Sequence, residues 1–253
     1  MPKIAIITGA SSGIGKGLAE RYSHAGYDVG LIARRESELL ELQSSLPTKA
    51  LIGVCDVSQK DAIFSCIQKI ILEFGRVDVL IANAGISEPS PAQNANADAL
   101  DSTISINTLG AGYSAYAVIP TMIQQQSGHI VVISSLASYR GLPEAGAYSA
   151  SKAAVNALFE SMRLDLKQHH IDVSIIRPGF IQSAITDRNT FPMPFLLSID
   201  SGCDIIFNAL LKKKKIMAFP WPLAIIVKTL YFWPCWLYDY CLAGIRNKKI
   251  PSN

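Results

Sequence analysis

The chain has little cysteine for its 253 residues, and the cysteines are not arranged as a framework. There are five, an odd number, and no two of them have the spacing of a CxxC motif. A disulfide framework is therefore not expected, nor is a zinc site or any other metal site. A reducing compartment is the default for such a sequence, so we expect a cytoplasmic protein.

Long apolar runs are also missing. The chain starts with "MPKIAIITGASSGIG", whose apolar run "IAII" is shorter than the core expected of a signal peptide. No stretch reaches the roughly 18–20 uninterrupted apolar residues that a membrane-spanning helix needs. The chain also has little excess of charge of one sign, because its net charge is only +3. Such a small excess gives no basis for predicting nucleic-acid binding.

What the sequence does contain is a regular alternation of short apolar segments and longer segments of helical period. The predicted strands span residues 3–8, 28–33, 49–57, 77–85, 128–135, 171–179 and 215–220. The predicted helices span residues 15–26, 36–46, 60–75, 98–125 and 148–169. Strands separated by helices favour parallel βαβ units. We therefore predict one α/β domain over residues 1–253, a Rossmann-like, doubly wound, mostly parallel sheet of seven strands flanked by helices.

The turn "TGASSGIG", residues 8–15, follows the first predicted strand and opens the first helix. Gly9 permits a tight exit from the strand, Gly13 lets the backbone approach a ligand, and Gly15 lets helix and sheet pack closely. The free N–H groups at the start of the helix would then face a pyrophosphate. An ordinary strand-to-helix turn is the alternative, but three glycines within seven residues favour a dinucleotide site.

The end of the second predicted strand indicates which dinucleotide. In this fold an acidic residue there accepts hydrogen bonds from the adenosine ribose, which favours NAD. Here Ala33 stands at that position, and Arg34 and Arg35 follow. A guanidinium can bind a 2′-phosphate through two hydrogen bonds, so the sequence favours NADP(H), with NAD(H) also accepted. The alternative is that both arginines form a solvated face at the start of a helix.

With these motifs the chain resembles the short-chain dehydrogenase/reductase family over about residues 3–185. The motifs stand in the family's order: "TGASSGIG" at 8–15, "DV" at 56–57, "NAG" at 83–85, "INTLG" with Asn107, "ISSLAS" with Ser135, "YSASK" at 148–152 and "RPG" at 177–179. A YxxxK motif occurs by chance in many chains. Its place thirteen residues after Ser135 makes coincidence a poor explanation.

The resemblance implies a catalytic set of Asn107, Ser135, Tyr148 and Lys152. Residues four apart on a helix share a face, so the Lys152 ammonium can stabilise the Tyr148 phenolate and lower its pKa from about 10. Tyr148 would then exchange a proton with a carbonyl or alcohol oxygen, and Ser135 would hydrogen-bond the same oxygen. Lys152 would also bind the nicotinamide ribose, and Asn107 would hold a water of a proton relay.

The resemblance also implies a set of cofactor-binding residues. Asp56 would bond the adenine amino group, Val57 would line its pocket, and Gly85 would leave room for the ribose. Asn83 would stabilise strand packing. Ile181 and Ser183 fall where the family holds the carboxamide; many members have threonine in place of Ser183. The full set is Gly9, Ser11, Ser12, Gly13, Ile14, Gly15, Arg34, Arg35, Asp56, Val57, Asn83, Ala84, Gly85, Tyr148, Lys152, Pro178, Gly179, Ile181 and Ser183.

The expected function is that of an NADPH-dependent oxidoreductase that reduces a carbonyl or oxidises a secondary alcohol. Residues 180–212 would close the substrate site, and 180–198 is apolar apart from "TDRN", which implies a hydrophobic substrate. A non-catalytic NADP-binding sensor or scaffold is the alternative from another class. A nucleotide-sugar dehydratase or epimerase is disfavoured, because those relatives have longer segments after the position of "RPG".

An apolar helical C-terminal extension, residues 220–246, departs from many relatives. Its aromatic residues are Trp221, Tyr231, Phe232, Trp233, Trp236, Tyr238 and Tyr240. In one interpretation, short helices cover the substrate pocket or a partner in a homodimer, which buries most of these rings. In the other, residues 220–249 contact a membrane peripherally, with "KKKK" at 212–215 and Arg246, Lys248 and Lys249 attracting anionic lipid.

Overall fold

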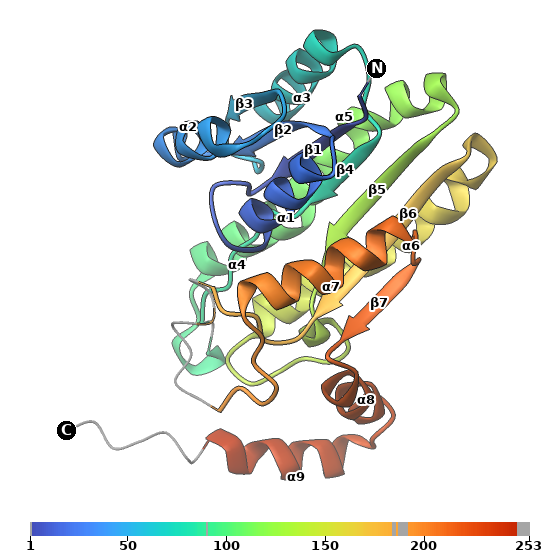
Figure 1. Cartoon of the computed structure of the whole chain (residues 1–253). Coiled ribbons are helices and arrows are strands. Elements are labelled where there is room, and N and C mark those ends of the chain that lie inside the picture. The colour runs from blue at the N-terminus through green and yellow to red at the C-terminus, as the bar shows by residue number, and fades with distance from the viewer. Residues whose placement is uncertain (1, 90, 184–185, 187–191, 247–253) are drawn as a thin grey trace.

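A parallel β-sheet forms the centre of the molecule (Figure 1). The structure is a computed structural model, and it describes residues 2–246 apart from 90, 184–185 and 187–191. In this part of the chain the seven strands are β1 (Ile4–Thr8), β2 (Asp28–Ala33), β3 (Ala50–Val54), β4 (Val79–Ala82), β5 (Gly128–Ile133), β6 (Ile171–Pro178) and β7 (Ile216–Phe219). Their order, β3–β2–β1–β4–β5–β6–β7, is doubly wound, because the sheet extends to both sides of β1. This confirms the predicted fold class.

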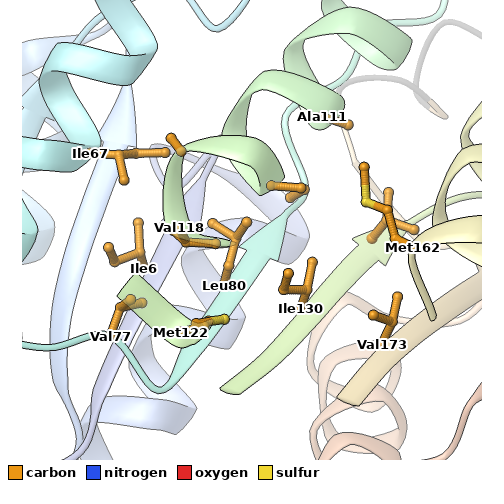
Figure 2. Close-up of a cluster of buried hydrophobic side chains, with 14 of the residues drawn as sticks. Ile6, Ile67, Val77, Leu80, Ala111, Val118, Met122, Ile130, Met162 and Val173 are labelled. Atoms are coloured by element: carbon orange, nitrogen blue, oxygen red, sulfur yellow. The ribbon is translucent and has the colours of Figure 1, made fainter. Parts of the chain in front are cut away.

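Helices cover both faces of the sheet. The α-helices of the described residues are α1 (Gly13–His24), α2 (Glu36–Ser45), α3 (Lys60–Phe74), α4 (Ala97–Ile104), α5 (Ala111–Gln125), α6 (Gly146–Asp165), α7 (Ile199–Leu211), α8 (Trp221–Leu230) and α9 (Cys235–Arg246). The core on one face joins α3, α5 and α6 to the sheet, and Figure 2 shows part of it. The core on the other face joins α1, α2 and α7.

Each central strand is buried on both faces, which explains the continuous apolar runs of the sequence. In β1, Ile4 and Ile6 face the cluster of α3, α5 and α6, whereas Ala5 and Ile7 face the cluster of α1, α2 and α7. A strand that alternates between two cores needs apolar residues at every position. Because all the strands are parallel, the first residues after each strand lie at the same edge of the sheet, where they are free to form a site.

Helix α7 was not predicted. It begins after Ser198, whose side-chain oxygen accepts a hydrogen bond from the backbone N–H of Ser201. Cys203, Ile206 and Leu210 recur at helical spacing and are buried in the core beside α1. The sequence contains both signals, the capping serine and the helical period. The prediction instead assigns this stretch to the segment 180–212 that closes the substrate site.

The long helix predicted over 98–125 is present as a continuous helical run with a change of winding in its middle. Helix α4 passes into a π-helical stretch, Ser105–Gly110, and then into α5. Gly110 is required there, because a Cβ atom would lie 2.7 Å from Cγ2 of Val57. Such π-helical turns often occur at functional sites, and this one carries Asn107.

The C-terminal extension lies at the end of the sheet where the strands finish (Figure 1). Helices α8 and α9 follow the last residue of β7, whereas Lys212–Lys215 precede its first residue. The basic run therefore lies at the opposite end of β7 from the aromatic helices, and Lys213 pairs there with Asp172 at 2.6 Å. The expectation that these lysines support the aromatic residues at one surface is not met. Lys248 and Lys249 lie outside the described residues.

Most aromatic side chains of the extension are exposed in the single chain. The exposed fractions include 72% for Trp221, 75% for Phe232, 72% for Trp236 and 81% for Tyr240. Tyr238 is buried. The expected burial of most of the aromatic rings against the chain's own substrate pocket therefore does not occur. Within the described residues no helix is both long enough and apolar enough to cross a bilayer.

Candidate active site

A cavity of about 990 Å³ opens at the carboxyl ends of the strands. Four groups of residues line it: the turn after β1, the ends of β2, β3 and β4, the catalytic candidates on β5 and α6, and the segment after β6. Of the predicted site residues, all but Gly15 and Asn107 line this cavity. It also has lining residues that the sequence did not single out, namely Cys55, Ile86, Ser87, Glu88, Ile106, Ile133, Ser134, Gln182, Thr186 and Ile199.

Thr186 is the most informative of the residues that were missed. Its hydroxyl accepts a hydrogen bond from the N–H of Ser183 at 2.8 Å and donates to a backbone carbonyl in the same turn. It therefore fixes the backbone around Ser183. The hydroxyl in "TDRN" was a signal for this turn; residues 187–189 of that motif lie outside the described residues.

The glycine-rich turn is built around close backbone contacts. Gly9 has a φ of +67°, and a Cβ there would lie 2.9 Å from Cα of Ala84. A Cβ on Gly15 would lie 2.2 Å from the carbonyl oxygen of Gly9. Gly13 has a φ of +56° and faces open space, since the nearest atom to its Cβ position is Cβ of Ser183 at 4.0 Å. Two of the glycines thus permit packing, and the third leaves the mouth of the turn clear.

The turn is held against β4 by Thr8 and Asn83. The Asn83 side-chain amide donates to the carbonyl oxygens of Thr8 at 3.0 Å and Gly9 at 3.3 Å. The Thr8 hydroxyl accepts hydrogen bonds from the N–H groups of Asn83 and Ala84. This network joins the two strands at which the sheet order reverses, and it consumes the Asn83 amide in packing.

The two arginines after β2 lie beside the same turn. Arg35 donates from Nη2 to the hydroxyls of Ser11 and Ser12, each at 2.9 Å. Arg34 forms an ion pair with Asp56 at 3.7 Å, and its side chain is 64% exposed. Both cations therefore border the cavity next to the start of α1, where the backbone dipoles also favour an anion.

Tyr148 and Lys152 lie one turn apart at the start of α6, and Ser135 follows β5. The Lys152 ammonium donates a hydrogen bond to the carbonyl oxygen of Ile133 at 2.9 Å. It lies 5.8 Å from the centre of the Tyr148 ring. Burial lowers the pKa of Lys152 to about 8. A lysine that is normally charged at pH 10 can thus lose its proton close to neutrality.

The pKa of Tyr148 is raised by burial, and a hydrogen bond with Ser135 acts in the opposite direction. The expected lowering of the Tyr148 pKa is therefore not found in the chain alone, because removing a phenolate from water is costly. A phenol with a raised pKa is a weaker acid that stays protonated at neutral pH, so it carries the proton that a reduction requires.

Asn107 lies behind the cavity and is almost completely buried. Its amide donates to the carbonyl oxygen of Ile86 at 2.9 Å and to the hydroxyl of Ser151 at 3.0 Å, and its Oδ1 accepts from the N–H of Ile86. A Cβ on Gly85 would lie 3.1 Å from Oδ1 of Asn107 and 3.4 Å from Nζ of Lys152. Glycine at position 85 therefore keeps the space between these two side chains open.

The residues around the cavity fit a nicotinamide dinucleotide. The clear mouth at Gly13 lies at the start of α1, and the Ser12 side chain does not cap that helix, which leaves N–H groups for a phosphate. Cations border one end of the cavity, and a tyrosine, a serine and a lysine lie at another. The class that the fold and this site define is a dinucleotide-dependent oxidoreductase.

Comparison with known proteins gives the family. Residues 3–191 match the model of the short chain dehydrogenase family. An uncharacterized oxidoreductase of Myxococcus xanthus is 34% identical over 250 residues, which cover 96% of this chain and 98% of that protein. The chain belongs to the short-chain dehydrogenase/reductase family. It is an enzyme that acts on CH–OH or C=O groups with NAD(P).

Solved structures share the fold. An alcohol dehydrogenase from the archaeon Thermococcus sibiricus, complexed with 5-hydroxy-NADP, is 26% identical with a TM-score of 0.76, over 87% of this chain and 95% of that chain. A short-chain dehydrogenase/reductase from Burkholderia phymatum, in complex with NAD, is 23% identical with a TM-score of 0.84, over 100% of this chain and 98% of that chain. Both nicotinamide dinucleotides thus occur on this fold.

Proposed function

We propose that this chain is an NADPH-dependent carbonyl reductase or alcohol dehydrogenase in which Tyr148 is the general acid and base. The observation that carries the proposal is that Tyr148, Ser135 and Lys152 line the same cavity as the glycine-rich turn and the two arginines. A non-catalytic sensor would have no need of three polar groups converging on one wall.

Each residue has a role that follows from its place. A bound nicotinamide dinucleotide supplies or accepts the hydride. Tyr148 donates the phenolic proton to the carbonyl oxygen in reduction and accepts it back in oxidation. Ser135 hydrogen-bonds the phenol and directs it toward the substrate oxygen. Lys152 stabilises the phenolate once the proton has left, because its ammonium lies on the same helix face.

In this proposal Asn107 does not touch the substrate and acts by positioning other groups. Its side chain ties the segment that follows β4 to α6 through Ile86 and Ser151. It therefore holds the backbone on which Lys152 stands, and it borders the space beside Gly85 where a water of a proton relay would lie.

The preference for NADPH rests on Ala33, Arg34 and Arg35. Ala33 lines the cavity where an acid would repel a 2′-phosphate, and the guanidinium of Arg35 is already oriented by Ser11 and Ser12. Arg34 would exchange part of its pairing with Asp56 for the phosphate. The apolar character of 192–198 and of the extension favours a hydrophobic substrate.

We further propose that the protein is a cytoplasmic homodimer that contacts membranes peripherally through the exposed rings of residues 220–242. The support is the group of large apolar side chains that the single chain leaves in water. Dimerisation through the same rings is the competing use of this surface.

The test of the catalytic proposal is a cofactor-oxidation screen. Purified protein is mixed with NADPH or NADH and a panel of aliphatic, steroid-like and acyl ketones, and loss of absorbance of the reduced cofactor is recorded. We expect oxidation of NADPH with at least one apolar ketone, at a lower KM for NADPH than for NADH. Tight binding of NADPH without turnover on any ketone or, in reverse, any alcohol would favour the sensor.

A further inference from the structure

The loop between Ser135 and Tyr148 is fastened to the C-terminal extension by Arg140. Its Nη1 donates to the carbonyl oxygen of Leu230 at 2.6 Å and to that of Trp233 at 2.8 Å. These carbonyls lie at the end of α8 and in the turn before α9, where a helix has no partners of its own for its last C=O groups. One guanidinium therefore closes the corner between the two helices.

The same side chain also holds α9. The guanidinium carbon of Arg140 lies 3.7 Å from the centre of the Tyr238 ring, a cation–π contact. The Tyr238 hydroxyl donates in turn to the carbonyl oxygen of Gly141, the next residue of the loop. Tyr238 is buried and Trp233 is half-buried, whereas the other aromatic side chains of the extension are exposed. Two consecutive loop residues thus bind both helices of the extension.

The other side of this loop is tied to the sheet. The Arg177 guanidinium lies 5.0 Å from the centre of the Tyr139 ring, and its Nη1 donates to the Tyr139 hydroxyl at 3.2 Å. Arg177 also pairs with Glu160 of α6 at 3.1 Å. Because Tyr139 and Arg140 are adjacent, the loop connects the extension to β6 and to the helix that carries Tyr148.

A second contact brings the extension to the cavity wall itself. Leu223 of α8 packs with Leu136, which follows Ser135, in a separate small core. A Cβ on Gly179 would lie 2.9 Å from Cδ2 of Leu223 and 3.3 Å from Cδ1 of Leu136. Gly179 lines the cavity. A movement of α8 would therefore shift the part of the cavity wall that lies between Ser135 and the segment after β6.

From these contacts we propose that Arg140 is a positioning residue: it locks α8 and α9 onto the loop between Ser135 and Tyr148, and so sets the substrate end of the active site. The expected change in KM for a ketone rests on the proposed function. We expect the affinity for the cofactor to depend little on Arg140, because the glycine-rich turn and the two arginines that follow β2 belong to other elements.

The experiment compares four full-length variants with the natural protein. They are Arg140→Ala, Tyr238→Ala, the double variant, and Lys228→Ala as a matched control, since Lys228 is an exposed cation on α8. Hydrogen exchange is followed for peptides from 136–145 and from 221–242. The dissociation constant for NADPH is measured by fluorescence, and KM and kcat are measured with acetophenone and 4-phenylbutan-2-one at saturating NADPH.

We expect Arg140→Ala to accelerate exchange in both segments and to raise KM for the ketones several-fold, with the NADPH dissociation constant changed by less than about twofold. The double variant should be no worse than the poorer single variant, because both substitutions break one joint. Lys228→Ala should match the natural protein.

The proposal is overturned if exchange rises only in 221–242 while KM is unchanged, since Arg140 would then merely stabilise the extension. Additive effects in the double variant would also overturn it, because the two residues would then act separately. If the natural protein reduces neither ketone, the catalytic proposal is in question, whereas joint acceleration of exchange in both segments would still support the lock.

Discussion

The Lys152 ammonium donates a hydrogen bond to the carbonyl oxygen of Ile133, the last residue of β5. This bond holds the ammonium between the strand that leads to Ser135 and the helix that carries Tyr148. A cation held in this place, 5.8 Å from the centre of the Tyr148 ring, would stabilise a phenolate there. Removing only the Tyr148 hydroxyl is therefore the substitution that disturbs the surrounding structure least.

Replacing Tyr148 by Phe should abolish turnover and leave the fold and NADPH binding nearly intact. The ring keeps its packing, and only the proton donor is lost, which typically costs about 10²–10⁴-fold in rate. The measurement is steady-state NADPH oxidation, with NADPH affinity and circular dichroism as controls. Turnover close to that of the natural protein would remove Tyr148 from the mechanism.

Replacing Arg34 by Ala should weaken NADPH binding more than NADH binding. The loss for NADPH should be at most about 1.5–3 kcal/mol, the strength of one hydrogen bond to a charged group. Titration calorimetry with both cofactors gives the comparison, and NADH serves as the internal control. Equal losses for the two cofactors would mean that the arginine does not bind the 2′-phosphate.

Acid should destabilise the protein through His129. This side chain is buried and hydrogen-bonded to Ser174, and burial lowers its pKa from 6.5 to about 4. Because the unfolded chain takes up the proton first, the stability that His129 contributes is lost as pH falls from 6.5 to 4. The difference corresponds to roughly 3 kcal/mol.

Urea unfolding at pH 7 and at pH 4.5 measures this loss, with His129→Gln as the comparison. The variant can still hydrogen-bond Ser174 but does not titrate, so its free energy of unfolding should depend less on pH over this range. Parallel curves for the two proteins would show that other groups cause the acid sensitivity.

Anionic vesicles test the exposed rings of the extension. We expect the full-length protein to sediment with vesicles that contain phosphatidylserine, and the double variant Trp221→Ala, Trp236→Ala to remain in solution. Replacing Lys212 and Lys214 by Ala should have little effect, because these residues lie at the other end of β7. Failure of the natural protein to sediment at low salt would leave dimer contact as the use of these rings.

The sequence predicted the sheet well, but it overran the ends of five strands, and by the most in β3 and β4. The third strand was expected to reach residue 57 and ends at Val54; the fourth was expected to reach 85 and ends at Ala82. In both places the residues beyond the strand leave the sheet and line the cavity. Apolar pattern cannot separate a strand from the site that follows it, because both are built from small and apolar residues.

The candidate site was predictable where a motif has fixed spacing and not where the contacts join distant segments. The cavity brings together all the predicted site residues except Gly15 and Asn107. By contrast, nothing in the sequence links Arg140 to Tyr238, since their contact depends on how α8 and α9 turn back after β7. The separation of Lys212–Lys215 from the aromatic helices was hidden for the same reason: neighbours in sequence can lie at opposite ends of one strand.

The order of the strands has a consequence for biosynthesis. Taken in the sequence of their emergence from the ribosome, β2 pairs with β1 and β3 with β2, after which β4 takes the free side of β1 and each later strand joins the newest edge. No strand has to be inserted between two that are already paired, so the sheet can grow during translation. β7 and the two helices that Arg140 holds follow all the other strands, so the enzyme can complete its substrate end only after the rest of the sheet has been synthesised.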